Sequence, residues 1–300
     1  MKAFVTGATG FLGGRLTQKL LQRGDDVVAL VRRDVDLPGV ELVRGDVSNS
    51  EALRDAMRGC DAVFHVAARY EVGIPVVEAH AMYDVNVRGT ENVLDAAADL
   101  PRVVYVSTVN VFGNTHGQVV DETYVRPPGD WLSEYDRTKY LAHLEAKKRE
   151  NVVIAQPGAI YGPGDHSELG AQLDQARRGK LLFKALADVG INAVHVDDAA
   201  EGLLLVHDRG RLGESYVLGG EIMRLGEMID RVSPRPVRLT IPTALLKLAI
   251  PAGPLIGKLM GTGPNLRELI SASAGVTYWA GDAKARRELG YHPRTFAETR

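Results

Sequence analysis

Short apolar runs alternate with longer amphipathic segments through the first half of the chain. Five runs are rich in valine and bounded by polar residues, glycine or proline: KAFVT, DVVALV, AVFHVA, RVVYVS and NVVIAQP. Such runs are typical of strands buried in a parallel sheet. Segments of helical length lie between them, at 12–23, 50–57, 77–98 and 134–150. The alternation predicts an α/β fold, a Rossmann doubly wound parallel sheet with helices on both faces.

The pattern loosens after Pro157. A loop-like stretch is followed by a strand and a helix in INAVHVDDAAEGLLLVHD and by another strand in ESYVLGG. The final part of the chain predicts helices with many prolines and little strand alternation. We therefore expect a smaller, mostly helical substrate domain interleaved with the sheet. The expected dinucleotide-binding domain covers 1–163, with 191–219 returning to it, and the substrate domain covers 164–190 and 220–300.

Composition narrows the functional classes. The chain has 300 residues and a net charge of -2, so no basic field favours nucleic acid. The single cysteine, Cys60, excludes an intramolecular disulfide and fits a reducing compartment, so we expect a cytoplasmic protein. The apolar stretch at 239–261 is interrupted by prolines and lysines. It predicts one or two short amphipathic helices and no membrane span.

Three glycines follow the first predicted strand and open the first helix. Gly7, Gly10 and Gly13 have the spacing G-x-x-G-x-x-G. Glycines at this place permit a tight turn and let the backbone approach a pyrophosphate. The helix N-terminus adds N–H donors and a partial positive charge. The pattern predicts a bound dinucleotide.

The second predicted strand ends at two arginines, where an acidic residue would bind the ribose 2'-hydroxyl of NAD. Arg32 and Arg33 carry guanidinium groups that match a 2'-phosphate. This favours NADP(H) over NAD(H), unless both are surface charges beside a promiscuous pocket. Asp46 and Val47 follow a short strand and are expected near the adenine. The small pair at 67–68 ends another strand, where the backbone can approach the dinucleotide.

Tyr135 and Lys139 are four residues apart in a predicted helix, so both side chains share one face. A nearby ammonium favours the ionised phenol, which suits an acid–base tyrosine beside a hydride carrier. The histidines and the cysteine show no metal-ligand spacing, so we expect no metal site. Asp197 and Asp198 begin a helix and are expected to cap it.

These residues stand within a longer ordered set of motifs. The set resembles the extended short-chain dehydrogenase/reductase superfamily, or NAD-dependent epimerase/dehydratase family. It looks most like dihydroflavonol-4-reductase-like, 3β-hydroxysteroid-dehydrogenase-like and hopanoid-associated epimerase-like bacterial members. The motifs are TGATGFLG at 6–13, GDV at 45–47, HVAA at 65–68, NVRGT at 86–90, VSTVNVFG at 106–113, YDRTK at 135–139, PGAIYGPGD at 157–165 and VHVDDAA at 194–200.

The resemblance implies a catalytic hydroxyl, tyrosine and lysine. Tyr135 and Lys139 match directly, and alignment on VFG places Thr108 at the hydroxyl position, with Ser107 just before it. Asn86 matches a family asparagine with a structural or cofactor-side role. The implied cofactor-binding residues are Gly7, Thr9, Gly10, Phe11, Leu12, Gly13, Arg32, Arg33, Asp46, Val47, Ala67, Ala68, Tyr135, Lys139, Pro157, Gly158 and Ile160. The expected substrate contacts are Ser107, Asn110, Tyr70 and Tyr161.

The resemblance leaves the reaction open among three possibilities. Family epimerases often carry an arginine before the V-x-V-x-D segment, and here GINAVHVDD has none. With NADP(H), this favours a reductase of a small, relatively apolar ketone or aldehyde. A nucleotide-sugar epimerase or dehydratase is the alternative, and a non-catalytic dinucleotide sensor is another. Family members also dimerise through two helices, so we expect a homodimer through 76–98 and 134–150.

Overall fold

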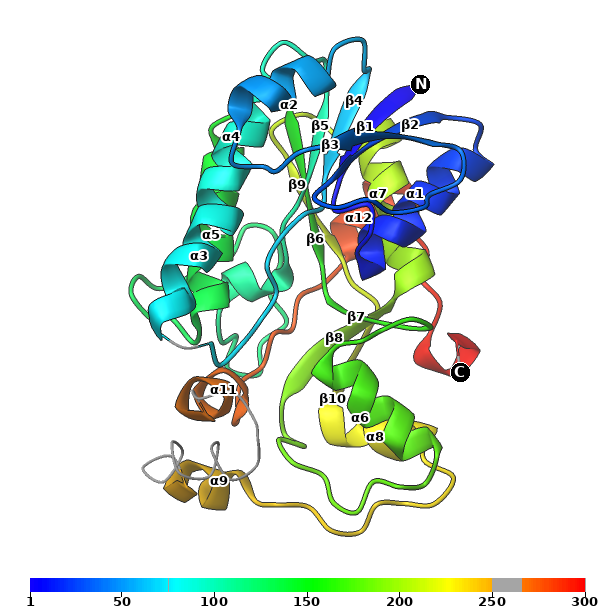
Figure 1. The fold of residues 1–300 in the computed structure, drawn as a ribbon. Helices are drawn as coiled ribbons and strands as arrows, with labels where there is room; N and C mark the ends of the chain where they lie inside the picture. The colour runs from blue at the N-terminus through cyan, green and yellow to red at the C-terminus, as the bar shows by residue number, and fades with distance from the viewer. Residues whose placement is uncertain (75, 250–265, 300) are drawn as a thin grey trace.

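The computed structural model describes residues 1–74, 76–249 and 266–299. Within this part of the chain, seven parallel strands form one large sheet in the order β3-β2-β1-β4-β5-β6-β9 (Figure 1). The chain starts in the middle and winds first to one edge and then to the other, so the order switches beside β1. The strands are β1 (Lys2–Thr6), β2 (Asp26–Val31), β3 (Val40–Arg44), β4 (Ala62–His65), β5 (Val103–Val106), β6 (Val152–Pro157) and β9 (Ser215–Leu218).

The central strands are buried on both faces because almost all of their residues are apolar. Every residue of β4 and β6 is buried, whereas the edge strand β3 is partly exposed. In β1, Ala3 and Val5 face one side of the sheet and Phe4 the other, as the two-residue period of a strand requires. The register sets Phe4 between Val28 and Val63. The predicted Rossmann sheet is confirmed.

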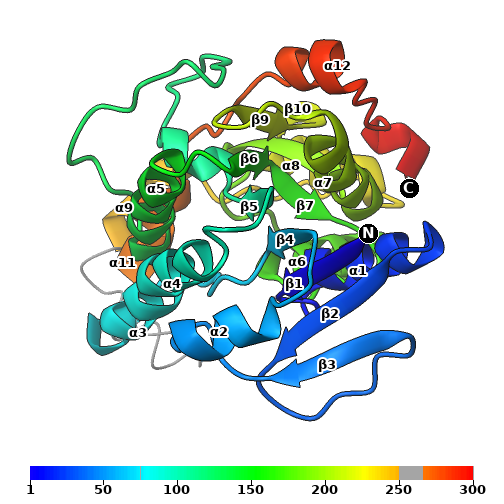
Figure 2. The same cartoon turned by 90° about the horizontal axis from the view of Figure 1, so that it is seen from above.

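Helices cover both faces of this sheet, as Figures 1 and 2 show. Leu16 of α1 and Leu203 of α7 share one core with Val5. Leu94 of α4 and Ala142 of α5 share the core on the other face. The first layer holds α1 (Phe11–Gln22), α7 (Val196–Arg209) and α12 (Ala283–Leu289), and the second holds α2 (Ser50–Ala56), α4 (Gly89–Ala96) and α5 (Glu134–Lys147).

The helix predicted for 77–98 is a chain of shorter segments. A 3-10 turn η1 (Val76–Glu78) and α3 (Ala79–Tyr83) lead into a π-helical segment η2 (Asp84–Arg88), which passes directly into α4. Asn86 lies in η2 and is buried. Its Oδ1 accepts from the Arg69 N–H at 2.7 Å, and its Nδ2 donates to Arg69 O and Thr138 Oγ1, both at 3.0 Å. The π segment thus lets Asn86 tie the loop after β4 to α5.

A smaller sheet lies beyond the carboxyl ends of the large one. Its central strand β8 (Gly190–His195) pairs in parallel with β7 (Ala159–Tyr161) and antiparallel with β10 (Glu221–Arg224). Two helices, α6 (Glu168–Arg177) and α8 (Leu225–Val232), pack on this sheet. The sequence reasoning missed β7 and β10, because three or four residues are too few to show a strand period.

The segment 191–219 is divided between the two sheets. Its β8 belongs to the small sheet, whereas α7 and β9 pack with the large one. The expected division into two domains stays a prediction. Helices were predicted for the apolar stretch at 239–261, and α9 (Thr243–Ala249) is one of them. Residues 250–261 of that stretch lie outside the described residues. Helix α11 (Leu266–Ser273) comes later in the chain. None of the described helices is long and apolar enough to cross a membrane.

Candidate active site

The glycine turn after β1 fits a pyrophosphate. Gly7 has φ +77°, and a Cβ there would lie 2.8 Å from the backbone N of Ala67. A Cβ on Gly13 would lie 2.0 Å from the carbonyl oxygen of Gly7. Helix α1 begins at Phe11 behind Gly10, with no side-chain cap and no acidic residue in its first turn. Its first N–H groups are therefore available to an anion.

Guanidinium groups gather at the ends of β2 and β3. Arg32 and Arg33 directly follow β2, both are exposed, and neither forms an ion pair within the described residues. Arg44 ends β3 opposite Val31, and its guanidinium lies 3.6 Å from the carboxylate of Asp34. Sequence reasoning missed Arg44, although its place directly before the GDV motif was a usable signal. Doubly wound folds hold the adenosine ribose at this edge.

The other predicted cofactor residues lie along the same edge, because parallel strands end together. Ala67 N donates to Thr6 Oγ1 at 3.2 Å, which fixes the backbone after β4. A Cβ on Gly158 would lie 2.1 Å from the carbonyl oxygen of Asn192, so the close approach of the β6–β7 junction to β8 requires glycine. These positions are Thr9, Phe11 and Leu12 after β1, Asp46 and Val47 after β3, Ala67 and Ala68 after β4, and Pro157, Gly158 and Ile160 at β6 and β7.

Strand β5 and helix α5 bring the three predicted catalytic residues together. Tyr135 and Lys139 lie one turn apart on α5, and Thr108 follows β5. Tyr135 is 8% exposed, Thr108 7% and Lys139 4%. Lys139 Nζ donates to the Val106 carbonyl at 2.8 Å, and Thr108 lies near enough to Tyr135 to lower the pKa of its phenol. The cluster therefore combines a hydroxyl, a phenol and an amine away from bulk water.

Burial controls protonation in this cluster. Burial raises the pKa of Tyr135 well above its usual value, and the nearby Thr108 hydroxyl opposes only part of this rise. The sequence predicts that Lys139 lowers the tyrosine pKa, but in the structure desolvation outweighs any such effect. Burial also lowers the pKa of Lys139 to about 7, and its Nζ donates to the Tyr105 hydroxyl at 3.2 Å. Tyr135 is thus a neutral phenol that carries its proton.

The neighbours Ser107 and Thr108 point to different partners. Ser107 Oγ lies 3.1 Å from Nδ1 of His143 on α5, and both residues are buried. Burial lowers the pKa of His143 to about 3, so this imidazole is neutral. Thr108 Oγ1 donates to Asn110 Oδ1 at 3.2 Å and lies near the Tyr135 phenol, whose pKa it lowers. The structure therefore groups Thr108 with the phenol and Ser107 with the core beneath α5.

Asp136, directly after the tyrosine, is a buried carboxyl group that sequence reasoning missed. Its Oδ1 accepts from Asn110 Nδ2 at 3.1 Å, and its Oδ2 accepts from the Tyr278 hydroxyl at 3.4 Å. An ionised carboxylate only accepts, so the Asn110 amide must turn its nitrogen to Asp136 and its oxygen to Thr108. Burial raises the pKa of Asp136 to about 6, opposed by the Asn110 hydrogen bond and the positive charge of Arg126.

The two tyrosines predicted to touch substrate lie in different surroundings. The Tyr70 ring meets the Tyr135 ring edge-on, with centroids 4.8 Å apart, and Tyr70 is 65% exposed. Tyr161 is 2% exposed, packs on Phe296, and places its hydroxyl 2.5 Å from Thr299 Oγ1. Tyr70 thus borders the Tyr135 phenol, whereas Tyr161 belongs to the core of the small sheet.

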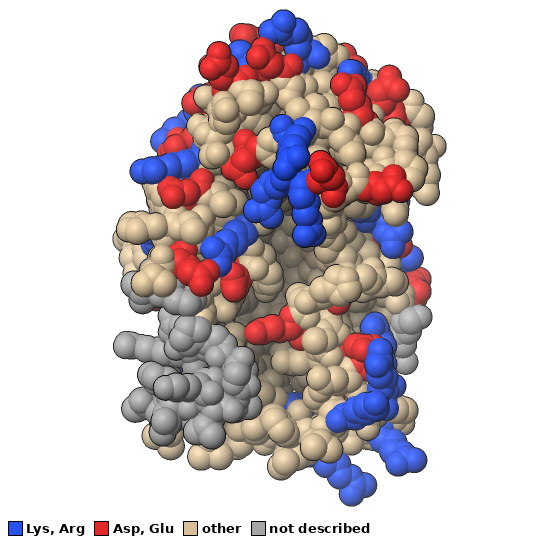
Figure 3. Space-filling view, in the orientation of Figure 1, with Lys and Arg blue, Asp and Glu red and all other residues tan. Residues whose placement is uncertain are grey.

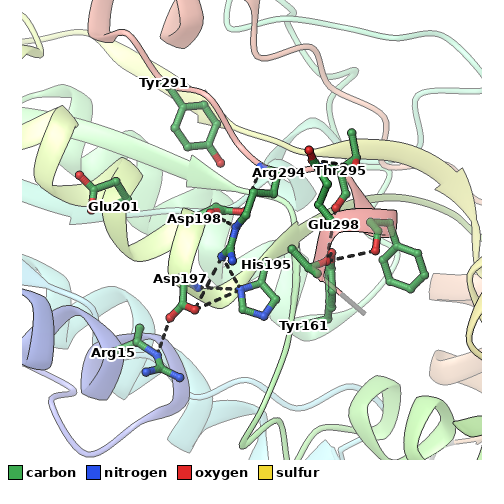
Figure 4. A network of polar contacts seen from close by, with 12 residues as sticks. Arg15, Tyr161, His195, Asp197, Asp198, Glu201, Tyr291, Arg294, Thr295 and Glu298 are labelled. Atoms are coloured by element: carbon green, nitrogen blue, oxygen red, sulfur yellow. Dashed lines mark hydrogen bonds and ion pairs between the residues drawn. The ribbon is translucent and has the colours of Figure 1, made fainter.

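A polar network joins the start of α7 to α1 and the C-terminal segment (Figure 4). Asp197 pairs with Arg15 at 2.8 Å, and Asp198 pairs with Arg294 at 2.9 Å. The predicted capping by the two aspartates is wrong, because their carboxylates turn to arginines. His195 caps instead, its Nδ1 accepting from the Asp197 N–H at 3.2 Å. Within the described residues, no group of acidic, histidine and cysteine side chains is arranged to hold a metal.

Comparison with known proteins identifies the family. Residues 3–219 match the family model described as the NAD dependent epimerase/dehydratase family. The chain belongs to this family. It is 34% identical over 247 residues to a Synechocystis sp. protein named as a dihydroflavonol 4-reductase, which covers 77% of this chain and 71% of the relative. The predicted extended short-chain dehydrogenase/reductase membership is confirmed.

Two further members of the family resemble the whole chain. A 4-hydroxy-2-methyl-3-oxo-4-farnesyl-3,4-dihydroquinoline-1-oxide ketoreductase of Stigmatella aurantiaca is 31% identical over 314 residues, covering 98% of this chain and 92% of its own. The crystal structure of a double mutant of DesIV, a dTDP-glucose 4,6-dehydratase from Streptomyces venezuelae, with NAD and DAU bound, gives a TM-score of 0.76 at 25% identity. It covers 100% of this chain and 94% of its own. Family relatives thus include both reductases and dehydratases, which supports an NAD(P)-dependent enzyme.

Proposed function

We propose that this protein is an NADP(H)-dependent oxidoreductase with Tyr135 as its acid–base residue. It reduces the ketone or aldehyde of a small, relatively apolar substrate, or oxidises the corresponding alcohol. The buried, neutral phenol beside Thr108 carries the proposal, because a carbonyl that gains a hydride needs a proton donor. The names of the Synechocystis reductase and of the ketoreductase with a farnesylated substrate support this reaction class.

The side chains would share the work as follows. Bound NADP(H) supplies the hydride, which no protein side chain can provide. Thr108 donates a hydrogen bond to the substrate oxygen and holds it beside the phenol. Tyr135 gives its proton to that oxygen as the carbon gains the hydride, and in oxidation it takes the proton back. Lys139, one helical turn away, stabilises the phenolate that Tyr135 becomes.

Replacing Tyr135 with phenylalanine tests the proton donor. The Tyr135→Phe variant should lose turnover by a factor of about 100 or more, because general acid catalysis is removed. Its NADPH affinity, measured by fluorescence titration, should change little. Tyr140→Phe, on the same helix, is the matched control and should keep full activity. Equal turnover in wild type and Tyr135→Phe on a carbonyl panel would refute the mechanism.

The same experiment separates the alternatives. Turnover of a nucleotide sugar without added NADPH would favour an epimerase or dehydratase, as the DesIV likeness allows. Tight NADPH binding without turnover on either class of substrate would favour a dinucleotide sensor.

We also propose NADP(H) over NAD(H), on the grounds of Arg32 and Arg33 after β2, which form no ion pair with any described residue. A 2'-phosphate would pair with Arg32 and Arg33, and NADH lacks that group. Replacing both with alanine should weaken NADPH binding by about 10- to 100-fold while NADH changes little, as expected for lost charge-assisted hydrogen bonds. Arg58→Ala, in the turn after helix α2, is the control. A parallel loss for both cofactors would contradict the preference.

A homodimer through 76–98 and 134–150 is the third part of the proposal. Leu144 is 38% exposed on α5, so this helix offers an apolar contact that the protomer does not bury. Light scattering after gel filtration should give the mass of two chains. Leu144→Glu should shift the protein towards one chain, and an unchanged mass would place the interface elsewhere.

A further inference from the structure

Two segments distant in sequence lie side by side at the lower end of the molecule in Figure 1. These are 177–184 and 233–248, which we call the lower face. They are joined by main-chain hydrogen bonds, from Lys184 N to Leu239 O at 2.8 Å and from Ile241 N to Lys184 O at 2.9 Å. Its exposed large apolar side chains are Leu182 (82%), Phe183 (42%), Leu239 (61%), Leu245 (57%) and Leu248 (76%).

The lower face is also strongly basic. Its two segments contain seven lysines and arginines and no aspartate or glutamate, in a chain whose net charge is -2. Of these seven cations, two form an ion pair with a described residue. Arg178 pairs with Asp174 at 2.8 Å, and Lys184 pairs with Asp230 at 2.6 Å. Lysines and arginines stand out at the lower end in Figure 3. The other five cations of the lower face form no ion pair with any described residue: Arg177, Lys180, Arg235, Arg238 and Lys247.

The combination of leucines and cations selects one kind of partner. Cations alone would suit a nucleic acid, because lysines and arginines bind its phosphates. Binding to phosphates does not explain the five exposed apolar side chains. Exposed apolar side chains alone would suit another protein surface. An anionic lipid surface uses both, since leucines enter the boundary between headgroups and acyl chains while lysines and arginines meet the negative headgroups.

We propose that the lower face docks on a membrane surface that contains anionic lipids. The protein would lie on the bilayer without crossing it, which agrees with the short helix α9. Docking depends on the lower face alone and not on the proposed reductase activity. If that activity holds, the docked enzyme would meet apolar carbonyl substrates that partition into the bilayer.

Vesicle flotation tests this proposal on the full chain. The vesicles would be phosphatidylcholine with about 30% phosphatidylserine, and phosphatidylcholine alone would serve for comparison. Wild type should float with the anionic vesicles and release at about 0.5 M NaCl, because salt screens the headgroup attraction. Replacing Leu182 and Leu245 together with serine should reduce binding at least about tenfold, because both apolar anchors are lost. Replacing Arg235 and Arg238 with serine should also reduce it.

Controls keep the outcomes distinct. Val119 and Val125 are 57% and 82% exposed in a loop outside the lower face, so their double serine variant should float like wild type. Thermal melting and NADPH titration would show that each variant is folded. The proposal is overturned if wild type does not float at low salt, or if the leucine and control variants bind alike. A third outcome would also overturn the proposal. In it, wild type and the leucine variant bind single-stranded DNA equally well, and neither protein binds the vesicles.

Discussion

Asp136 should make the stability of this protein depend on pH in an unusual direction. Its pKa is raised from 3.8 to about 6, mainly by burial. The folded protein therefore holds the Asp136 proton more tightly than the unfolded chain does, and folding is favoured while that proton stays bound. Stability should fall as the pH rises from about 4 to about 6 and level off above that range.

The size of the effect follows from the shift. About two pH units at about 1.4 kcal/mol each give a loss of about 3 kcal/mol in the free energy of unfolding. Asp136→Asn removes the titrating proton but keeps the shape and a hydrogen-bonding side chain. Compared with wild type, the variant should gain stability steadily between about pH 4 and pH 6, by up to about 3 kcal/mol, and hold the gain at neutral pH.

Urea unfolding at several pH values, followed by fluorescence, measures this difference. Subtracting wild type from variant cancels the other carboxyl groups, which titrate in both proteins. The exposed Asp130, changed to asparagine, controls for the loss of a negative charge. The reasoning would be refuted by an Asp136→Asn difference that stays constant, or that shrinks, from pH 4.5 to 7.5.

Three further predictions concern the glycine turn after β1 and the cluster of Thr108, Tyr135 and Lys139. Gly13→Ala puts a Cβ 2.0 Å from a backbone oxygen, so the start of α1 must shift; NADPH affinity should fall at least about tenfold by fluorescence titration. Tyr105→Phe removes the hydroxyl that accepts from Lys139 Nζ at 3.2 Å, so the pKa of Lys139 should fall. The limb of the kcat/KM pH profile that reports Lys139 should then move to lower pH. A limb that does not move would contradict the importance of this contact. Thr108→Ala should cut turnover about 100-fold while Ser107→Ala mainly lowers the melting temperature, and similar turnover in the two would contradict their separate roles.

Much of the fold could be predicted from the sequence, because parallel strands buried on both faces must be apolar along their whole length. The runs that become β1, β2, β4, β5 and β6 show this directly. The short strands β7 and β10 gave no such signal. They are strands because β8 lies between them and supplies their hydrogen-bond partners. This pairing depends on the tertiary structure and not on the local sequence. The same holds for the π segment around Asn86, which follows from contacts with Arg69 and Thr138.

The site divides in the same way. The sequence by itself determined that Tyr135 and Lys139 share a helix face, because the helix period is local, and that glycines open the first helix. Only the tertiary structure separated Thr108 from Ser107, since the choice depends on how the end of β5 meets α5. It also brought Asp136 to Asn110, 26 residues away. No periodicity along one segment encodes such contacts, because they exist only where two packed elements bury polar groups that must then satisfy each other.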